Sequence, residues 1–328
     1  MIDFTVVIPS RNRPVLLAVA VRSVLEQTHA SVEVVVVNDG SNPEYGDAYA
    51  TIAARPRVRM INLRPTANGH GPSFAINRGA EAATGRYVCL LDDDDYWTDP
   101  EHLARAWQHL SANEGSAEVY FSNQVAYMND KPLAARIWLE PVADILRKRG
   151  ATAEDGVFAP TLRDLMQCGN FCHFNTTIVS RDLYWRCGGM DEFIRYENDR
   201  DYYLRVIDQA NGILFYPGVV SRHNVPDPAL TVNASTVVTY QQKMLFRNYL
   251  WNKARLFAAS PLIRQQARIN VGFTMRRIAE ALAGEPGRAL EAFRFARQAL
   301  GAHFTVKWMA YCAWLGLRAL FRRRSPGA

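Results

Sequence analysis

The first third of the chain alternates between two hydrophobic patterns. Unbroken apolar or β-branched runs are typical of strands that are buried on both faces of a parallel sheet. Between these runs apolar residues recur at helical spacing, and Pro14 suits the first turn of a helix. The runs predict strands at 5–8, 32–37, 58–63 and 87–91, and the spacing predicts helices at 14–26 and 72–83. This order indicates parallel β-α-β units and therefore an α/β fold, with the first strand stopped by Pro9.

The pattern becomes irregular after about residue 122. Residues 126–170 contain three prolines and no clear period, which is typical of an insertion or a lid over a substrate site. The later segments that predict strands are 176–179 and 213–216. Two prolines between 224 and 228 indicate the edge of a domain. We therefore expect one domain over 1–230.

Residues 231–328 predict a helical extension that is rich in arginine, alanine and aromatic residues. Its last helix is expected to carry an apolar stripe formed by Phe304, Trp308, Tyr311, Trp314, Leu315 and Phe321. Such a stripe has two interpretations. It packs against the first domain or a second subunit of a homo-oligomer. Alternatively, it lies on an anionic membrane surface, with the arginines at 322–324 on the lipid headgroups.

Composition and charge narrow the class of protein. With 48% hydrophobic and 21% charged residues, the 328-residue chain is expected to fold. The net charge of +6 is uneven, because acidic clusters lie between 92 and 201 and the tail is basic. A basic tail suits an anionic partner, but no nucleic-acid-binding motif is present. Five scattered cysteines favour a reduced, cytoplasmic chain, and no signal peptide or membrane span is predicted.

Carboxylates gather where predicted strands and helices meet loops. Asp39 follows the strand at 32–37, and four aspartates at 92–95 follow the strand at 87–91. A third group, at 197–201, precedes a predicted helix. In an open parallel sheet, ligands bind beyond the carboxyl ends of the strands. Each group also has an ordinary interpretation, as a turn, a solvated loop or a helix cap.

The four aspartates at 92–95 indicate a cation site. Adjacent carboxylates repel one another, and oxygen-only ligands suit Mg²⁺ or Mn²⁺. Asp92 and Asp94 lie on the same side of an extended chain, so they could share one ion. Cys168, Cys172 and His173 are a weaker candidate for zinc, because their spacing is not typical of a zinc site.

Several segments together resemble glycosyltransferase family 2, whose members have the GT-A fold. In the order and spacing of that family the chain has VVIPSRNRP at 6–14, SVLEQT at 23–28, VVVVNDGS at 34–41, ATGRYVCLLDDDD at 83–95, CGGMDE at 187–192 and NDRD at 198–201. Such an ordered set is more specific than any single motif. The resemblance implies a Rossmann-like, mixed and mostly parallel sheet flanked by helices. It also implies a nucleotide-sugar-binding part at about 1–123 and an acceptor part at about 124–230.

The resemblance assigns the donor end of the site. Pro9, Arg11 and Asp39 would line the nucleoside pocket, with Asp39 facing the base. Asp92 and Asp93 would bind the nucleotide near its diphosphate. Relatives usually carry an arginine just before the asparagine that is Asn77 here, and this chain has isoleucine instead. Either Arg78 takes over the diphosphate contact or the contact is lost.

The resemblance also assigns the metal and the base. Asp94 and Asp92 would hold Mn²⁺ or Mg²⁺, with His223 near the ion. Asp199 would take the proton of the acceptor hydroxyl. The activity implied is inverting transfer from a nucleoside-diphosphate sugar, most simply a UDP-sugar, to a glycan, a lipid-linked acceptor or another hydroxyl. Envelope polysaccharide or glycolipid synthesis, in the cytoplasm or on the inner face of the cell membrane, fits this activity.

Two other functions compete with this one. A nicotinamide-dependent dehydrogenase would need a glycine-rich turn after the first strand, and PSRNR at 9–13 stands there instead. The second function is a nucleotide-binding or membrane-associated scaffold with the same fold but no turnover. A broken acidic cluster or a missing base would favour it. Both are intact in the sequence.

Overall fold

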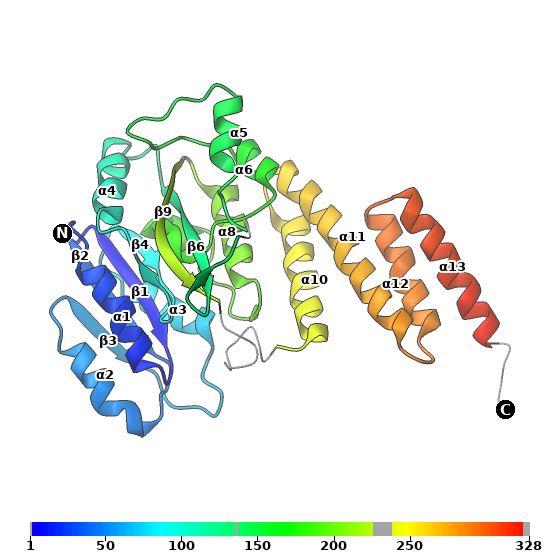
Figure 1. Ribbon diagram of the computed structural model, residues 1–328, viewed down its shortest axis with the longest axis horizontal. Coiled ribbons are helices and arrows are strands. Elements are labelled where there is room, and N and C mark those ends of the chain that lie inside the picture. Colours follow the sequence, from blue (N-terminus) through cyan, green and yellow to red (C-terminus); the bar gives the residue numbers. More distant parts are fainter. Residues whose placement is uncertain (1, 135–136, 226–237, 324–328) are drawn as a thin grey trace. The chain divides into compact units, whose positions relative to one another are not determined.

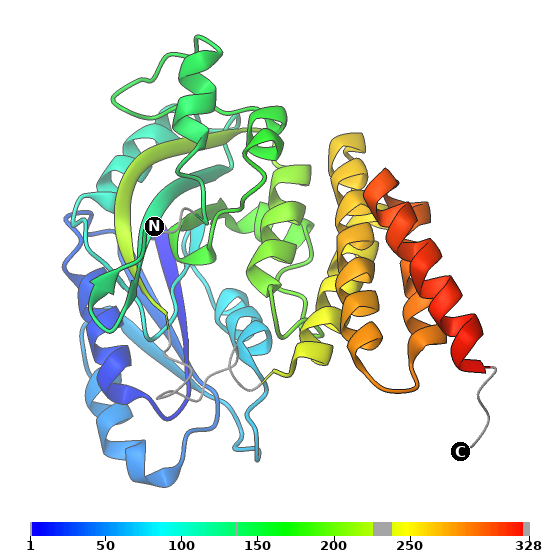
Figure 2. The same ribbon diagram turned by 45° about the vertical axis from the view of Figure 1, so that its right-hand side comes forward.

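The computed structural model describes residues 2–134, 137–225 and 238–323, with side-chain surroundings up to residue 320. The chain divides into two compact units, Met1–Thr236 and Val237–Ala328. The first unit is an α/β domain and the second is helical (Figures 1 and 2). The α/β fold with a helical C-terminal region, expected from the sequence, is therefore confirmed.

The first unit contains nine strands and eight α-helices among its described residues. Its strands are β1 (Phe4–Ser10), β2 (Val32–Asn38), β3 (Val58–Asn62), β4 (Tyr87–Leu90), β5 (Tyr96–Trp97), β6 (Val119–Met128), β7 (Lys131–Pro132), β8 (Thr177–Ser180) and β9 (Ile213–Asn224). Its helices are α1 (Pro14–Leu25), α2 (Gly46–Ala53), α3 (Pro72–Glu81), α4 (His102–Ala112), α5 (Val142–Lys148), α6 (Leu162–Cys168), α7 (Arg181–Arg186) and α8 (Asn198–Gln209), with short 3₁₀ turns η1 (Pro43–Tyr45) and η2 (Phe174–Thr176).

All nine strands join one mixed sheet in the order β3-β2-β1-β4-β8-β6-β9-β5, with β7 paired to β6. The first four strands are parallel, as the β-α-β pattern predicts. β8 is antiparallel to both β4 and β6, and β9 runs parallel to β6 beside it (Figure 2). The carboxyl ends of β1, β2, β4 and β9 and the start of β8 therefore meet at one edge of the sheet.

Alternating residues of β1 and β2 send their side chains to opposite faces of the sheet. Phe4, Val6 and Ile8 join a fully buried core with residues of α1, α2 and α4. On the other face α3 packs closely, because a Cβ at Gly79 would stand 2.3 Å from Val7 Cγ1. On that same face, farther along the sheet, Phe121 of β6 contacts a tyrosine of α8 at a ring distance of 5.5 Å. Helices thus cover both faces, as expected for strands with nearly continuous apolar sequences.

Some predicted boundaries were wrong. β1 continues through Pro9 to Ser10. Pro9 is tolerated because β4 pairs with β1 only as far as Val7, so Pro9 lies where that neighbour has ended. The segment 126–170 is more regular than expected, since it contains the end of β6, β7, α5 and α6. The strand predicted at 213–216 continues to Asn224.

The second unit consists of α10 (Tyr240–Phe257), α11 (Pro261–Gly284), α12 (Ala289–Ala302) and α13 (Val306–Arg323), each packed against the next. Alanines on α11 and α12 allow close packing, and Trp308 fills the space with its Nε1 donating to the carbonyl of Ala296 at 2.9 Å. None of the described helices is long and apolar enough to cross a bilayer.

The single stripe expected on the last helix was wrong. Trp308 and Leu315 are buried in the core of the second unit, whereas Phe304 and Trp314 are exposed. The side chain of Phe321 lies outside the described residues. The apolar residues of this segment therefore belong to two faces, because one of them packs on α12.

Candidate functional site

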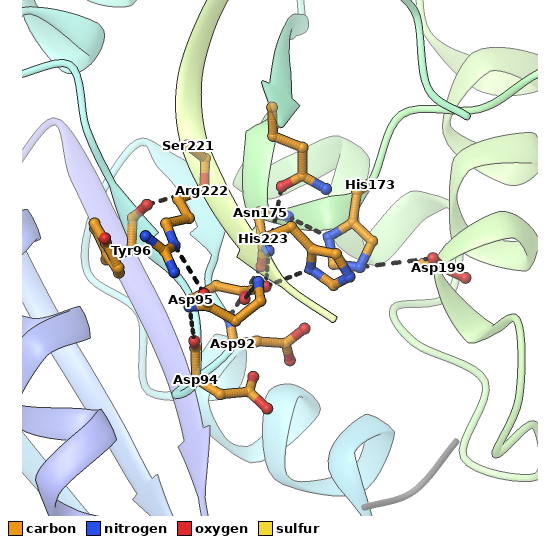
Figure 3. Close-up of polar contacts among 12 residues, drawn as sticks. Asp92, Asp94, Asp95, Tyr96, His173, Asn175, Asp199, Ser221, Arg222 and His223 are labelled. Atoms are coloured by element: carbon orange, nitrogen blue, oxygen red, sulfur yellow. Dashed lines mark hydrogen bonds and ion pairs between the residues drawn. The ribbon is translucent and has the colours of Figure 1, made fainter. Parts of the chain in front are cut away.

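Chemical groups from distant parts of the sequence meet at the edge where the strand ends lie together. Pro9 is the last residue but one of β1, and Asp39 follows β2 directly. The four aspartates at 92–95 follow β4 and lead into β5. His173 precedes β8, and His223 lies near the end of β9, so both approach the aspartates from the far half of the sheet (Figure 3).

Three of the four aspartates converge. Asp92, Asp94 and Asp95 each offer one carboxylate oxygen within 4.8 Å of the other two, a spacing that could hold a metal ion. Burial raises the pKa of Asp92 well above its ordinary value, and repulsion from Asp94 and Asp95 adds to the shift. Burial and the charge of Asp95 also raise the pKa of Asp94. Carboxylates that are buried together in this way favour a cation.

Asp95 is largely satisfied by the protein itself. Its Oδ2 accepts a hydrogen bond from His223 Nδ1 at 2.7 Å and another from Asn175 Nδ2, and its Oδ1 accepts one from Asn224 N at 2.6 Å. Asn175 also accepts a hydrogen bond from Asp92 N at 2.9 Å through its Oδ1 (Figure 3). Asp95 therefore anchors the acidic turn, and Asp92 and Asp94 are the more available metal ligands.

Asp93 points away from this group and pairs with Arg13. Its side chain is only 1% exposed, and it binds Arg13 Nη2 with one oxygen and Arg13 Nε with the other, the second at 3.2 Å. Arg13 Nη1 reaches Asp94 Oδ2 at 2.7 Å. Burial raises the pKa of Asp93 to about 7 although Arg13 favours its charge.

Asp199 lies in the first turn of α8, across from the acidic turn. One of its oxygens accepts a hydrogen bond from Arg200 N at 2.8 Å, and the other lies 3.7 Å from His173 Nε2. Burial raises the pKa of Asp199 to about 6. Asp201, the next acidic residue, forms an ion pair with Arg205 at 2.7 Å and is therefore engaged elsewhere.

His173 connects the two sides of the site. Its Nδ1 accepts a hydrogen bond from Asn175 N at 3.3 Å, so the neutral ring carries its proton on Nε2, which faces Asp199. Burial, and then the nearby charge of His223, lowers the pKa of His173 well below its ordinary value. Burial would also lower the pKa of His223, but the ion pair with Asp95 outweighs it and the net shift is upward. The two rings lie 4.9 Å apart.

The loop before α3 closes over Asp39. His70 donates to Asp39 Oδ1 from its backbone N and its ring Nδ1, at 2.9 and 2.8 Å, and Gly71 N donates to Oδ2 at 3.0 Å. A Cβ at Gly69 would stand 2.5 Å from Asp39 Oδ2, and the φ of Gly69 is +67°, so this position requires glycine.

The two predicted basic residues lie near this loop. Arg11 Nη2 donates to the carbonyls of residues 66 and 67, each at 3.1 Å, and so braces the loop. Arg78 pairs with Glu81 at 2.5 Å and lies 5.0 Å over the ring of Phe74, which stacks on His70. Arg78 is thus linked to the Asp39 side of the site, and its contacts lie within its own helix.

The structure brings most of the predicted residues to one edge but adds several that sequence reasoning missed. Pro9, Asp39, Asp92, Asp94, Asp199 and His223 lie at the strand or helix ends described above. Arg13, His70 and Asn175 were not predicted, and His173 was considered only as a zinc ligand. Their roles here were not predictable from the sequence, because each acts through a contact with a distant segment.

Comparison with known proteins decides the family. The model of the family described as Glycosyl transferase family 2 matches residues 5–168, which is half of the chain. The chain belongs to glycosyltransferase family 2. The resemblance expected from its motifs is thereby confirmed.

Curated relatives match part of the chain. The succinoglycan biosynthesis protein ExoW of Rhizobium meliloti is 29% identical over 197 residues, covering 56% of this chain and 57% of the relative. The amylovoran biosynthesis glycosyltransferase AmsB of Erwinia amylovora is 32% identical over 148 residues, covering 44% of this chain and 48% of the relative. The chain thus spans about half of the length of these family members.

Solved structures share the GT-A fold. TarS of S. aureus, in complex with UDP-GlcNAc, matches with a TM-score of 0.68 at 14% identity, over 97% of this chain and 88% of TarS. A mannosyltransferase from Pyrobaculum calidifontis, in complex with GDP-Man and Mn²⁺, matches with a TM-score of 0.52 at 16% identity, over 98% of this chain and 88% of that protein. At this identity the likeness concerns the fold alone.

The electrostatics of the acidic turn generate a stability prediction. Replacing Asp92 by asparagine should stabilise the metal-free protein at neutral pH. The pKa of Asp92 is higher in the folded state than its ordinary, unfolded-state value. The stability of the fold is therefore fully present below the ordinary pKa and is lost as the pH rises through the folded-state pKa. Asparagine removes this loss, so we expect the free energy of unfolding to increase near pH 7.5, and to increase by less as the pH falls toward about 4.

Chemical denaturation at several pH values measures this difference. Asp144→Asn is a matched control, because Asp144 is 60% exposed and pairs only loosely, at 3.2 Å, with Arg147. The control should change stability by less than about 0.5 kcal/mol. A less stable Asp92→Asn protein at neutral pH would show that the carboxylate is held by attraction rather than strained by repulsion.

Proposed function

We propose that this protein is an inverting glycosyltransferase that moves a sugar from a nucleoside-diphosphate sugar, first of all a UDP-sugar, to an acceptor hydroxyl. The observation that carries the proposal is the convergence of Asp92, Asp94 and Asp95 at the strand edge that also holds Asp199. The first group suits a diphosphate with its divalent cation, and a separate carboxylate suits a base. Family membership supports the same chemistry.

The donor would lie along the carboxyl ends of β1, β2 and β4. In this proposal Pro9, Arg11 and Asp39 line the nucleoside end. Arg11 and His70 hold the loop that closes over Asp39, so they also shape this pocket. Arg78, through Phe74, supports the same loop.

The diphosphate end would be shared by the acidic turn and a divalent ion. The residues present fit Mn²⁺ or Mg²⁺, because the three converging side chains offer carboxylate oxygens and the pKa of Asp92 is raised by burial and by repulsion from its neighbours. Asp94 and Asp92 would hold the ion, with His223 beside it, and Asp95 would orient them. Such an ion neutralises the charge that develops on a departing diphosphate. Asp93 would contribute to this end of the site by holding Arg13 in an ion pair.

Asp199 would act as the base. It is partly buried, and its pKa of about 6 leaves it ionised but basic near neutral pH. The Nε2–H of His173 and the backbone N–H of Arg200 face its two oxygens and orient the carboxylate. A single base on the acceptor side suits direct displacement, which inverts the anomeric centre, whereas a double displacement needs an additional nucleophile.

The pathway and the donor are inferred from relatives. Two curated relatives are named for the biosynthesis of succinoglycan and of amylovoran, which supports a role in envelope polysaccharide or glycolipid synthesis. Structural neighbours hold UDP-GlcNAc or GDP-Man with Mn²⁺, which supports a nucleotide-sugar donor and a divalent cation. All five cysteines are free, which fits the reducing cytoplasm.

A panel of nucleotide sugars tests the donor and the metal. One UDP- or GDP-sugar should raise the melting temperature of the protein in the presence of Mn²⁺. The increase should be much smaller in excess chelator. Ligand at about 100 times its dissociation constant should add about 2.7 kcal/mol of stability. The Asp94→Asn protein should lose the Mn²⁺-dependent part. Equal stabilisation with and without metal would contradict the metal assignment, and no stabilisation by any donor would contradict the function.

Replacing Asp199 by asparagine tests the base. The amide keeps the shape and removes the basicity, so turnover should fall by about 10²–10⁴, or about 3–5 kcal/mol in barrier. For the wild type, kcat/KM should fall about tenfold per pH unit below about 6, because only the ionised carboxylate accepts a proton. The rate of nucleoside diphosphate release measures both effects.

Donor affinity should hardly change in the Asp199→Asn protein. Asp182→Asn, an exposed carboxylate in the first turn of α7, is the matched control and should keep its rate. Normal turnover by Asp199→Asn would place the base elsewhere. A wild type that binds the donor without transfer or hydrolysis would instead favour the catalytically silent scaffold.

We also propose that α13 contacts an anionic membrane. Its outer face exposes Val306, Met309, Trp314, Leu317 and Leu320, each at least 45% exposed. The helix contains lysine and arginine but no acidic residue, which complements anionic headgroups. The side chains at 322–324, expected to strengthen this contact, lie outside the described residues.

Liposome flotation with phosphatidylglycerol vesicles tests the membrane proposal. Leu317→Glu and Leu320→Glu should each weaken flotation, because they put a charge on the outer face while leaving the buried Trp308 face intact. Leu256→Glu, at an equally exposed site on α10, is the control and should float like the wild type. Attachment should weaken with salt, since the Debye length shrinks from about 10 Å at 0.1 M to about 3 Å at 1 M.

The opposite results have a definite meaning. If the α13 variants float as well as the wild type, another surface binds lipid. If the wild type does not float, the outer face of α13 covers a second copy or another protein, and size-exclusion chromatography of Leu317→Glu would reveal a change in oligomeric state.

A further inference from the structure

Arg13 directly precedes α1, and its guanidinium binds two aspartates of the acidic turn at 92–95. Its Nε and Nη2 hold both oxygens of Asp93, and its Nη1 holds Asp94 Oδ2 at 2.7 Å. Burial alone would lower the pKa of Arg13, but the charges of Asp93, Asp94 and Asp92 raise it. All three guanidinium nitrogens are therefore committed to carboxylates, one of which belongs to the converging group.

The two carboxylates bound to Arg13 are not equivalent. The side chain of Asp93 is 1% exposed, whereas that of Asp94 is 24% exposed. Leaving a buried carboxylate without its partner is strongly unfavourable, so Asp93 must keep the guanidinium. Asp94 can exchange its partner at lower cost because water and other cations reach it. Arg13 itself is 37% exposed and so borders the open side of the site.

A divalent cation at the acidic turn would compete with Arg13 for Asp94. The ion would draw on Asp92, Asp94 and Asp95, and Asp94 already interacts with the positive guanidinium. Two positive groups at one carboxylate repel each other, so binding of the ion weakens the contact of Arg13 with Asp94. The guanidinium then remains tethered through Asp93, with its Nη1 hydrogens free.

We propose that Arg13 is an internal counterion that exchanges with the divalent cation and then contacts the donor diphosphate. This inference rests on the proposed function. Without metal, Arg13 stabilises the acidic turn through Asp93 and Asp94. With metal, Nη1 leaves Asp94 and donates to a phosphate oxygen, while Nε and Nη2 stay on Asp93. Guanidinium donors suit phosphate oxygens in this way.

The position of the other arginine supports this role. No positive charge stands just before Asn77 on α3, because that position is Ile76, which is fully buried. Arg78, next on that helix after Asn77, is engaged with Glu81 and Phe74. Arg13 is in contact with the acidic turn, so it is better placed than Arg78 to reach the diphosphate.

Titration of the full chain with Mn²⁺ tests the exchange without any turnover. Free Mn²⁺ is measured by electron paramagnetic resonance, first alone and then with saturating UDP or GDP, whichever stabilises the wild type. Arg13→Lys keeps a point charge for Asp93 but cannot bridge to Asp94. The double variant Arg13→Gln/Asp93→Asn removes the guanidinium without leaving a buried charge unpaired.

Both variants should bind Mn²⁺ alone about three- to tenfold more tightly than the wild type, because Asp94 is released. The nucleoside diphosphate should increase the Mn²⁺ affinity of the wild type. In both variants this increase should be smaller, by about the same three- to tenfold factor. Arg22→Gln is the matched control, since Arg22 lies on the same helix, is 62% exposed and pairs weakly with Glu26 at 3.9 Å. Its Mn²⁺ affinity should equal that of the wild type.

Unchanged Mn²⁺ affinity in both variants, with and without nucleotide, would overturn the proposal and leave Arg13 as a structural partner of Asp93. Tighter Mn²⁺ binding with an undiminished nucleotide effect would overturn the diphosphate contact alone. If the wild type binds nucleotide but no Mn²⁺, the exchange is overturned together with the metal assignment. If it binds neither, the proposed function itself has failed.

Discussion

A buried carboxylate, Asp95, connects the two halves of the sheet at the functional edge. Its side chain is 0% exposed and receives hydrogen bonds from His223, Asn175 and the backbone of Asn224. A charge is tolerated in such a place only when donors surround it. The donors come from η2 and β9, so the acidic turn after β4 has its present shape only because the far half of the sheet is folded against it.

This anchor separates the roles of four adjacent aspartates. Asp95 is hydrogen-bonded to His223, whereas Asp93 points away from the group and forms an ion pair with Arg13. Asp92 and Asp94 are left at the open side with raised pKa values. The same anchor raises the pKa of His223, whereas burial, and after it the charge of His223, lowers the pKa of the neighbouring His173. One continuous polar network thus extends from the acidic turn to Asp199 (Figure 3).

The elements that sequence patterns predicted are those whose pattern is local. The buried runs became β1, β2 and β4, and the helical spacing became α1 and α3, within a few residues of the predicted bounds. β6 and α4 were not predicted, and β9 is longer than its apolar run. The second half of β9 contains polar residues such as Ser221, which is nevertheless fully buried, so its strand character depends on the pairing with β6 rather than on hydrophobicity.

The sequence by itself determined the family, the α/β fold and which carboxylates stand at strand and helix ends, because order, spacing and hydrophobic period are properties of the chain. Only the tertiary structure decided that Asp92, Asp94 and Asp95 converge while Asp93 turns to Arg13. It also decided that His173, remote in sequence from Asp199, faces it. Such partnerships depend on contacts between segments tens of residues apart, and the sheet that brings those segments together is set by the packing of the whole domain.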